Sequence, residues 1–182
     1  MAIRNILPDS EPQLRLKAKE VVKFDTDLAV FLDDMTETLI KANGVGLASN
    51  QVGILKRAVL IFFGEGNYEK VLENNPKSEK FFRKCNHQKS EDGGHMLELV
   101  NPKFVFKSKD EVIGEEGCLS IDRNGSRFFA EVMRSAKVAV EAQTRDGEKF
   151  TLKLEDWMAR VAQHEIDHLD GVLFIDYLKE KV

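Results

Sequence analysis

A hexapeptide towards the end of the chain, residues 163–168, reads Gln-His-Glu-Ile-Asp-His and constrains the fold more than any other stretch. It lies in a run, 154–170, that has acidic residues at its start and a glycine just past its end, which predicts one helix. In a helix, His164 and His168 project from one face with Cβ atoms roughly 5 to 6 Å apart, close enough to share a metal ion. Glu165 follows the first histidine, where it can act as a general base on a water beside that ion. Two helical histidines can also be ordinary core or surface residues, but the glutamate between them favours a metal site.

The composition is that of a globular chain, and its 182 residues suit a single domain over 1–182. A formal net charge of -4 argues against a protein that binds a nucleic-acid backbone. The first residues do not form a signal peptide, and no apolar run reaches membrane-spanning length, so we expect a cytoplasmic protein without a membrane partner. In that reducing compartment Cys85 and Cys118 are more often ligands or nucleophiles than a disulfide.

Several other segments carry secondary-structure signals. Apolar residues at helical spacing, with Gly44 beyond the last of them, predict a helix over 25–43 that packs on a sheet. Alternating apolar residues on either side of Asp146-Gly147 predict a β-hairpin. The predicted strands are 57–63, 99–106, the hairpin strands 138–143 and 149–154, and a short final strand at 172–175.

Residues 64–97 change to a polar composition, and we interpret them as a long excursion from the fold, either an ordered flap or a mobile loop. The segment contains Cys85, His87 and His95, which could form a second metal site. We favour a solvated loop, because these residues lack the repeated close-pair spacing of such sites.

The stretch 44–51 reads Gly-Val-Gly-Leu-Ala-Ser-Asn-Gln and has neither phosphate-loop nor dinucleotide-binding spacing. Its small residues leave the backbone accessible, so that a ligand could lie along it as an added strand and Gln51 could donate an amide hydrogen bond. Taken alone, a glycine-rich turn into the next strand is the better explanation.

A tight bend at Gly117 is expected to present Cys118 at the end of a strand. A thiolate is a soft ligand, and with His164 and His168 it would make a three-ligand site with an open position. A lone cysteine can instead be a small buried hydrophobe or the nucleophile of a thiol hydrolase. The histidine pair favours the metal, because a nucleophile needs only one histidine as its base.

Three stretches in this order, 44–51, 116–120 and 163–168, together resemble the peptide deformylases, whose motifs read G-x-G-[LM]-A-[AS]-x-Q, E-G-C-L-S and H-E-x-D-H. The turn at 146–147 and the ending Leu-Asp-Gly-Val-Leu-Phe at 169–174 also look like that family, so the resemblance covers most of the chain. It implies an α+β fold with antiparallel β-sheets packed around a central metal-binding helix and an N-terminal helix against the sheet.

The resemblance also implies a reaction. Cys118, His164 and His168 would hold the metal, usually Fe²⁺ in the family, with Zn²⁺, Ni²⁺ or Co²⁺ as substitutes. Glu165 would take a proton from a water and later pass one to the departing amine. The substrate would be the formylated N-terminus of a nascent peptide, met near the ribosome, and the products formate and a free N-terminus. We expect a monomer that binds no specific nucleic acid.

Several residues near the metal are candidates for contacts with the substrate. The amide of Gln51 and the backbone N–H of Leu119 could stabilise the oxyanion. Gly46 could lend backbone hydrogen bonds, while Val45 and Leu119 could touch the methionine side chain. Arg160 and Val161 are two further candidates, because they lie on the metal-facing side of the predicted helix.

Arg160 is a departure from the family pattern, since relatives tend to have an aliphatic residue there. Either its guanidinium snorkels outward and its alkyl stem lines the pocket, or it narrows or charges the pocket. Arg134 is expected to form a buried pair with Glu116, the alternative being a surface charge.

Two other functions remain open. The long segment 64–97 and Arg160 would suit a metal amidase of altered substrate preference. The second alternative is a deformylase-like protein that binds the N-termini of chains without turnover. Such a binding protein would need neither the base Glu165 nor the oxyanion donor Gln51.

Overall fold

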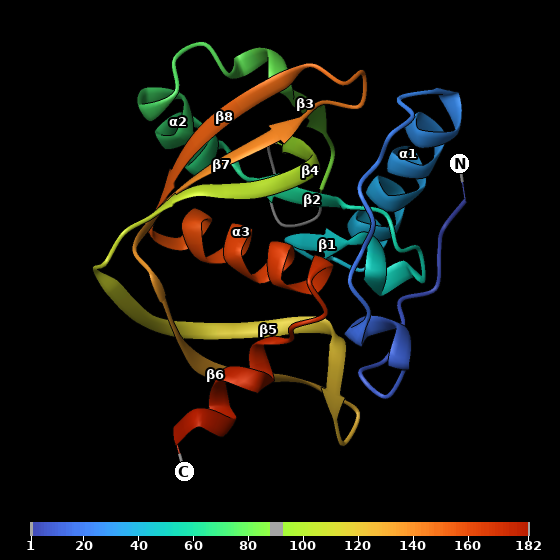
Figure 1. The fold of residues 1–182 in the computed structure, drawn as a ribbon, viewed down its shortest axis with the longest axis vertical. Coiled ribbons are helices and arrows are strands. Elements are labelled where there is room, and N and C mark those ends of the chain that lie inside the picture. Colours follow the sequence, from blue (N-terminus) through green and yellow to red (C-terminus); the bar gives the residue numbers. More distant parts are fainter. Residues whose placement is uncertain (1, 88–92, 182) are drawn as a thin grey trace.

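The computed structural model describes residues 2–87 and 93–181, and Figure 1 shows their arrangement. The α-helices are α1 (Thr26–Lys41), α2 (Glu65–Asn74) and α3 (Asp156–Leu169). The strands are β1 (Gly46–Ala48), β2 (Ala58–Phe63), β3 (Phe82–Cys85), β4 (Gly94–Lys107), β5 (Glu111–Arg123), β6 (Ser126–Ser135), β7 (Lys137–Gln143) and β8 (Lys149–Glu155). Short 3-10 helices lie at Pro12–Arg15, Ser49–Val52, Glu79–Phe81 and Phe174–Lys181.

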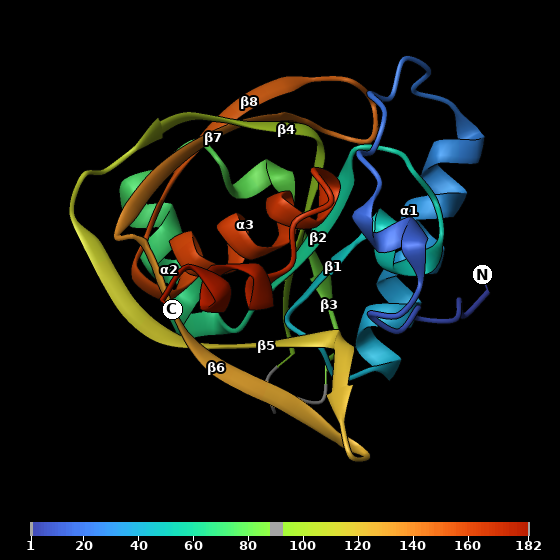
Figure 2. The same ribbon diagram turned by 60° about the horizontal axis from the view of Figure 1, so that its bottom comes forward.

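Antiparallel pairing joins the strands into two sheets. The larger sheet has the order β1-β2-β4-β7-β8, and β3 pairs with β4 beside this path. Strands β5 and β6 form a separate two-stranded ribbon, here called the β5–β6 ribbon. In Figures 1 and 2 the helix α3 lies between the large sheet and this ribbon. The predicted α+β fold, with antiparallel sheets around the histidine-bearing helix, is therefore confirmed.

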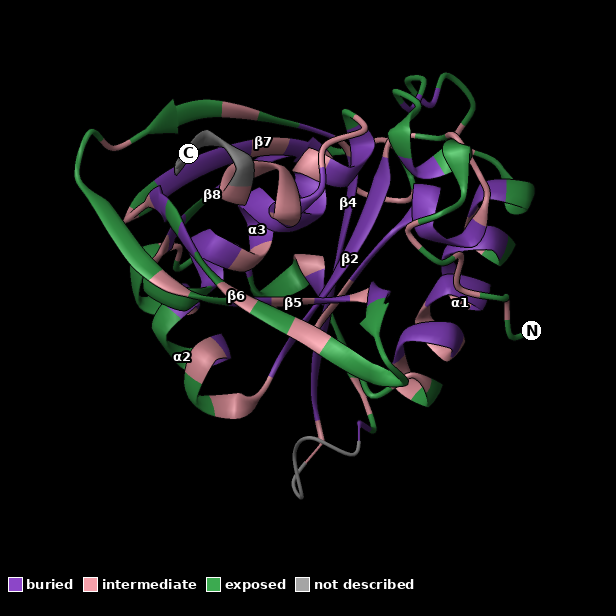
Figure 3. Cartoon of the chain, turned by 90° about the horizontal axis from the view of Figure 1, so that it is seen from below, coloured by how far each residue is buried: buried purple, intermediate pink, exposed green. Residues whose placement is uncertain are grey.

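Strand β2 explains why the large sheet is covered on both faces. All six of its residues are buried. Val59, Ile61 and Phe63 belong to the core that includes α3, and the alternate residues belong to the core that includes α1. Because successive side chains of a strand point to opposite faces, a continuous apolar run requires cover on both sides. Figure 3 shows β2 and α3 as mainly buried, whereas much of the β5–β6 ribbon is exposed.

Helix α1 confirms the predicted N-terminal helix and its packing on a sheet. It begins after Asp25, whose side chain accepts a hydrogen bond from the backbone N–H of Leu28 at 3.1 Å. Leu28, Leu32, Met35 and Leu39 are fully buried and form one apolar stripe towards β2. The cap and the stripe are local signals, which is why the sequence alone identified this helix.

Residues 64–97 are folded wherever the structure describes them, so the prediction of a solvated loop is wrong for that part. Residues 88–92 lie outside the described part. The segment contains α2, whose Tyr68 and Val71 are buried, and β3, which pairs with β4. Two apolar residues three apart give α2 one packing face, which its polar average composition conceals.

The predicted final strand at 172–175 is also wrong. The chain leaves α3 through Gly171, which has a positive φ of 77°, and enters the 3-10 helix Phe174–Lys181. Leu173 and Phe174 are buried in a small cluster with Val132 of β6. Packing against the ribbon, not strand pairing, therefore buries this apolar run.

The pairing of β5 with β6 was not predicted, although the turn between these strands carries a sequence signal. Asn124 and Gly125 join the strands with positive φ angles of 58° and 79°. Asn-Gly is the dipeptide that two-residue hairpin turns favour, because both positions require positive φ. By contrast, the hairpin of β7 and β8 is confirmed, with its turn at Gly147.

Within the described part of the chain, no helix has both the length and the apolar character that a transmembrane segment requires.

Candidate metal centre

Helix α3 positions the two histidines of the predicted site. His164 and His168 are both buried, and their ring centroids are 5.0 Å apart. The four-residue spacing places them one above the other on the helix face that contacts β5, where His168 meets Cys118 and His164 meets Glu116. The predicted shared orientation of the two rings is therefore present.

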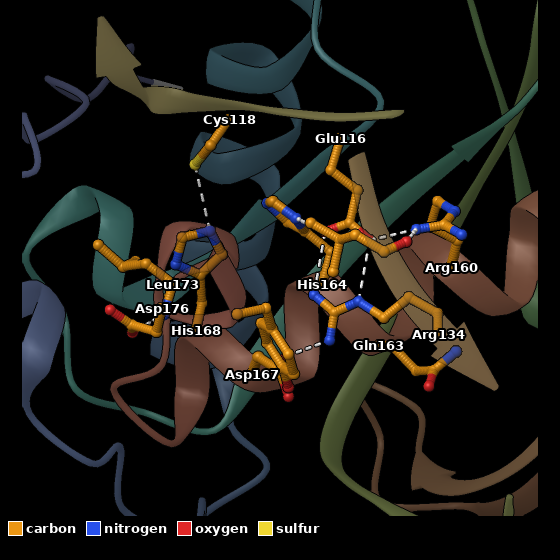
Figure 4. A network of polar contacts seen from close by, with 12 residues as sticks. Glu116, Cys118, Arg134, Arg160, Gln163, His164, Asp167, His168, Leu173 and Asp176 are labelled. Atoms are coloured by element: carbon orange, nitrogen blue, oxygen red, sulfur yellow. Dashed lines mark hydrogen bonds and ion pairs between the residues drawn. The ribbon is translucent and has the colours of Figure 1, made fainter. Parts of the chain in front are cut away.

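Cys118 of β5 completes a group of three ligand atoms. Its Sγ lies 3.3 Å from Nε2 of His168, and a dashed line marks this contact in Figure 4. The potential ligand atoms of Cys118, His164 and His168 lie within 4.8 Å of one another. No other group of at least three histidine, cysteine or acidic residues in the described structure has this geometry. One thiolate and two imidazoles are a donor set that suits a divalent transition metal.

The predicted bend before Cys118 is a local irregularity within β5, not the end of a strand. The pairing register of β5 with β6 shifts between Gly117 and Asp122. A Cβ atom at Gly117 would lie 2.4 Å from the ring of Phe129, so a side chain there would have to displace this ring of the neighbouring strand. The bulge turns the thiol of Cys118 towards α3.

Glu116 forms the centre of a buried polar network beside the ligands. Its Oε2 accepts from Nδ1 of His164 at 2.9 Å, and Arg134 donates to both carboxylate oxygens at 2.8 and 3.0 Å. The predicted Arg134–Glu116 pair is thus confirmed and buried. Burial alone would raise the pKa of Glu116, but hydrogen bonds from His164 and Arg134 lower it to about 2. An ionised Glu116 fixes which nitrogen of His164 remains available to a metal, namely Nε2.

The network continues outward from Arg134. This guanidinium also contacts Asp167 on α3, which accepts a hydrogen bond from Tyr177 at 2.8 Å. The ring of Tyr177 lies 4.3 Å from the guanidinium carbon of Arg134. The C-terminal 3-10 helix is therefore connected to the metal centre through a buried ion pair.

The two histidines differ in their protonation. Burial and the charge of His164 lower the pKa of His168 well below its usual value, so its ring is neutral and able to ligate. Burial also lowers the pKa of His164, but its contacts with Cys118 and Glu116 outweigh this and raise it to about 10. A metal that ligates this ring would therefore compete with a proton for it.

Glu165 lies on the same turn and is buried. Its Oε2 has no hydrogen-bond partner within the described structure. Burial raises the pKa of this carboxyl to about 7, with the charge of His164 opposing the rise. A carboxyl with a pKa near neutrality can both accept and donate a proton, as a general base and acid must.

Gln51 reaches the cysteine from the other side. Its Nε2 lies 3.4 Å from Sγ of Cys118 and 3.1 Å from Oγ of Ser120. Its Oε1 accepts from the backbone N–H of Ala48 at 2.8 Å, which fixes the orientation of the amide. The amide donor predicted from the glycine-rich stretch is therefore directed at the ligand cluster.

A cavity of about 270 Å³ lies over the ligands. It is lined by nine of the predicted site residues, Val45, Gly46, Gln51, Cys118, Leu119, Arg160, Val161, His164 and Glu165. The lining also contains four side chains that were not among the predicted site residues, which are Glu115, Arg127, Phe129 and Trp157. Arg127 and Phe129 belong to β6, so recognition of the Asn-Gly hairpin could have indicated them.

Arg160 is buried. One of the two predictions, that its guanidinium extends outward to solvent, is therefore wrong. It donates to Glu116 and to the backbone carbonyls of Val112 and Val132. The position on the metal-facing side of α3 was predicted, but the polar contacts of the side chain were not.

The second cluster of potential ligands does not form a metal site in the described structure. His87 stacks on Phe62 with ring centroids 4.1 Å apart, and His95 stacks on Tyr68 at 3.5 Å. Burial raises the pKa of the Cys85 thiol, which opposes formation of the thiolate. The two rings therefore have aromatic stacking partners in the described structure, and the non-metal interpretation of these residues stays a prediction.

Comparison with known proteins identifies the family. The family model described as polypeptide deformylase matches residues 3–182. The chain is 41% identical to a peptide deformylase of Caldicellulosiruptor bescii over 97% of its own length and 86% of the relative. It is 42% identical to that of Caldanaerobacter subterraneus subsp. tengcongensis, over 97% and 89% of the two chains. Its structure is similar to a peptide deformylase crystal structure from Thermotoga maritima, with a TM-score of 0.76, 32% identity, and coverage of 97% and 98%. Together with the cysteine and histidine cluster, these similarities show that the chain belongs to the peptide deformylase family of hydrolases.

Proposed function

We propose that this protein is a metal-dependent deformylase that removes the formyl group from the N-terminal methionine of nascent peptides and releases formate. The observation that carries the proposal is the convergence, in one cavity, of a three-atom ligand set and a buried carboxyl with a pKa near neutrality. Membership of the peptide deformylase family supports the reaction class.

Cys118, His164 and His168 would hold the metal, for which we propose Fe²⁺ as the native ion and Zn²⁺, Ni²⁺ or Co²⁺ as substitutes. The residues fit such an ion, because a soft thiolate and two imidazoles meet within 4.8 Å. A divalent cation in this position supplies Lewis acidity and lowers the pKa of water by several units.

Glu165 is the proposed general base, and then the general acid. Its carboxylate takes a proton as a water attacks the formyl carbon, and returns a proton to the amine as the C–N bond breaks. Gln51 and the backbone N–H of Leu119 are the proposed donors to the oxyanion. The distance of 3.4 Å between the Gln51 amide and Sγ of Cys118 supports a donor at the reacting centre.

Strand β1 is the proposed platform for the peptide. It lies at one edge of the large sheet, where an extended peptide can add as a further strand along Gly46. Val45, Val161 and the stem of Arg160 would then contact the methionine side chain, since all three line the cavity. A formyl hydrogen fits a confined site that the methyl group of an acetylated peptide would crowd.

We propose that the protein acts in the cytoplasm as a monomer, on chain ends close to the ribosome, without a specific nucleic-acid or membrane partner. The formal net charge of -4 supports the absence of a nucleic-acid surface.

Formate release from formyl-Met-Ala-Ser by anaerobically iron-loaded protein tests this function. We expect formate from this peptide and no acetate from acetyl-Met-Ala-Ser. Hydrolysis of other amides in preference to the formyl peptide would indicate a metal amidase of altered preference. Peptide binding without any formate would indicate a binding protein.

A Glu165→Gln variant tests the base separately. We expect it to retain its metal and to lose at least about 100-fold in kcat, because general acid–base catalysis contributes on the order of 10²–10⁴. Metal content measured by mass spectrometry is the control. Turnover close to that of the wild type would assign the base to another group.

A further inference from the structure

Arg160 has the most heavily bonded side chain among the candidate substrate residues. Its Nη1 donates to Glu116 at 2.8 Å and to the carbonyl of Val132 at 2.7 Å, and its Nη2 donates to the carbonyl of Val112 at 2.7 Å. These partners lie on β5 and β6, whereas Arg160 itself lies on α3. The guanidinium therefore joins the ligand helix to both strands of the β5–β6 ribbon.

Gly114 makes room for this guanidinium on β5. A Cβ atom at position 114 would lie 3.0 Å from three guanidinium atoms, Cζ, Nε and Nη2 of Arg160. Such a contact is tighter than an ordinary van der Waals contact, so the planar group rests closely on the strand backbone. The absence of a side chain at position 114 therefore leaves room for the guanidinium against β5.

The contacts divide the two oxygens of Glu116 between different partners. Oε1 accepts from Nε of Arg134 and from Nη1 of Arg160, both at 2.8 Å. Oε2 accepts from Arg134 at 3.0 Å and from Nδ1 of His164 at 2.9 Å. Figure 4 shows the carboxylate held between the two guanidiniums and the imidazole. Arg134 is itself held by Asp167 of α3, and Arg160 adds a second guanidinium, anchored to two backbone carbonyls of the ribbon, that binds Oε1 of the carboxylate.

We infer that Arg160 is a positioning residue of the metal centre, which holds Glu116 against Nδ1 of His164 and so fixes the ring that ligates the metal. Groups that orient a metal ligand through a hydrogen bond typically contribute 10-fold to 100-fold to metal affinity. The inference rests on the proposed function only in requiring that a metal binds this cluster. It gives Arg160 a role that is independent of the side-chain preference for substrate.

Metal affinity of an Arg160→Met variant tests the inference without any substrate. The matched control is Arg145→Met, because Arg145 also donates to carboxylates, Glu98 and Asp33, from the turn between β7 and β8. Dissociation constants for Co²⁺ would be measured by competition with a chelator, together with the visible spectrum of the Co²⁺ form and the Tm of the metal-free protein.

We expect both variants to lower the Tm, because each loses a guanidinium that joins several elements. Only Arg160→Met should weaken Co²⁺ binding, by about 10-fold to 100-fold, and shift the ligand-field bands in the visible spectrum. Unchanged affinity and spectrum in Arg160→Met would overturn the inference. An equal loss of affinity in Arg145→Met would also overturn it, since the effect would then be general destabilisation.

A double-mutant cycle tests whether Arg160 acts through Glu116. Glu116→Ala should weaken Co²⁺ binding, and adding Arg160→Met to it should cause less than a twofold further loss, because Glu116→Ala has already removed the acceptor that Arg160 contacts. Fully additive losses would contradict the proposed route.

Gly114→Ala offers a milder variant should Arg160→Met fail to fold. It retains the arginine but displaces it, and an affinity equal to that of the wild type would count against the inference.

This test remains separate from that of the proposed function. Loss of metal affinity in Arg160→Met would stand even if the wild-type protein released no formate. Conversely, normal deformylation with an unaltered Co²⁺ site in Arg160→Met would reject the positioning role alone.

Discussion

At the scale of single residues, the carboxyl group of Glu165 lies in the space that a side chain at position 46 would occupy. A Cβ atom at position 46 would lie 2.1 Å from Oε1 of Glu165, well inside the contact distance of the two atoms. The missing side chain therefore allows the carboxyl to lie against the backbone of β1. The same glycine leaves the edge of that strand open to a peptide.

Gly46→Ala should consequently impair catalysis through Glu165 and leave the ligands in place. We expect kcat to fall by at least about 10-fold, since even small displacements of a catalytic group are costly, while the bound metal remains stoichiometric. Formate release and metal analysis would measure the two effects. Gly66→Ala is the matched control, because nothing lies within 4 Å of its added Cβ atom in α2, and it should leave both quantities unchanged. A fully active Gly46→Ala protein would show that the close approach of Gly46 to the carboxyl does not position the base.

At the scale of elements, Asn75 attaches α2 to the edge of the large sheet. Its amide nitrogen donates to the carbonyl of Lys153 at 2.8 Å, and its amide oxygen accepts from the N–H of Lys153 at 2.9 Å. The side chain thereby occupies both backbone groups of one residue of β8, an edge strand. This contact protects an edge that would otherwise be open to another strand.

Asn75→Ala should therefore loosen the segment after β2 more than it affects the metal centre. We expect a loss of about 1 to 2 kcal/mol in the free energy of unfolding, on the order of one or two net hydrogen bonds. Urea unfolding and limited proteolysis would measure it, and cleavage should increase within α2. Asn74→Ala, at the neighbouring exposed position, is the control. Equal effects of the two substitutions would show that the contact with β8 contributes nothing.

At the scale of the whole molecule, the three proposed ligands connect α3 to the β5–β6 ribbon. Cys118 belongs to the ribbon, and the two histidines belong to the helix that packs on the large sheet. A bound ion would therefore connect the two sheets through α3. Binding to the folded state alone stabilises it by mass action.

Removal of the metal by a chelator should lower the Tm. An ion present at 100 times its dissociation constant adds about 2.7 kcal/mol to the free energy of unfolding. Calorimetry of the wild-type protein with and without chelator would measure the difference, and Cys118→Ala should show little response. A Tm that is insensitive to the chelator would argue against a metal shared by helix and ribbon.

Acid should destabilise the protein through Asp34, which anchors the N-terminal segment to α1. Its carboxylate accepts from the backbone N–H of Ala2 at 2.7 Å and from Arg4 at 2.9 Å, and these contacts lower its pKa. Because the folded state binds this proton more weakly than the unfolded state, the stabilisation is present above the unfolded pKa of about 4. It is lost as the pH falls through the lower, folded pKa.

The free energy of unfolding should therefore fall less between about pH 5 and pH 3 in Asp34→Asn than in the wild type. Urea titrations at a series of pH values would measure the two slopes. Identical slopes would show that the Asp34 carboxylate makes no pH-dependent contribution.

Much of the fold was predictable because its signals are local. The stripe of α1, the apolar run of β2 and the turn at Gly147 depend on neighbours a few residues away. The polar segment was mispredicted because only two buried residues, Tyr68 and Val71, mark the inner face of α2. The β5–β6 ribbon carries an Asn-Gly signal, but many of its side chains are exposed, so its strands lack the apolar alternation that marks β7 and β8.

The sequence by itself determined the family, the antiparallel architecture and the candidate ligand trio, because His164 and His168 share a helix face by spacing alone and Cys118 lies in the family's E-G-C-L-S motif. Only the tertiary structure decided where the guanidinium of Arg160 is bound and which nitrogen of His164 faces Glu116. The reason is physical. Helical periodicity fixes the direction in which a side chain leaves its own element, whereas its partner, 44 or 48 residues away in these two contacts, depends on how the ribbon packs against α3.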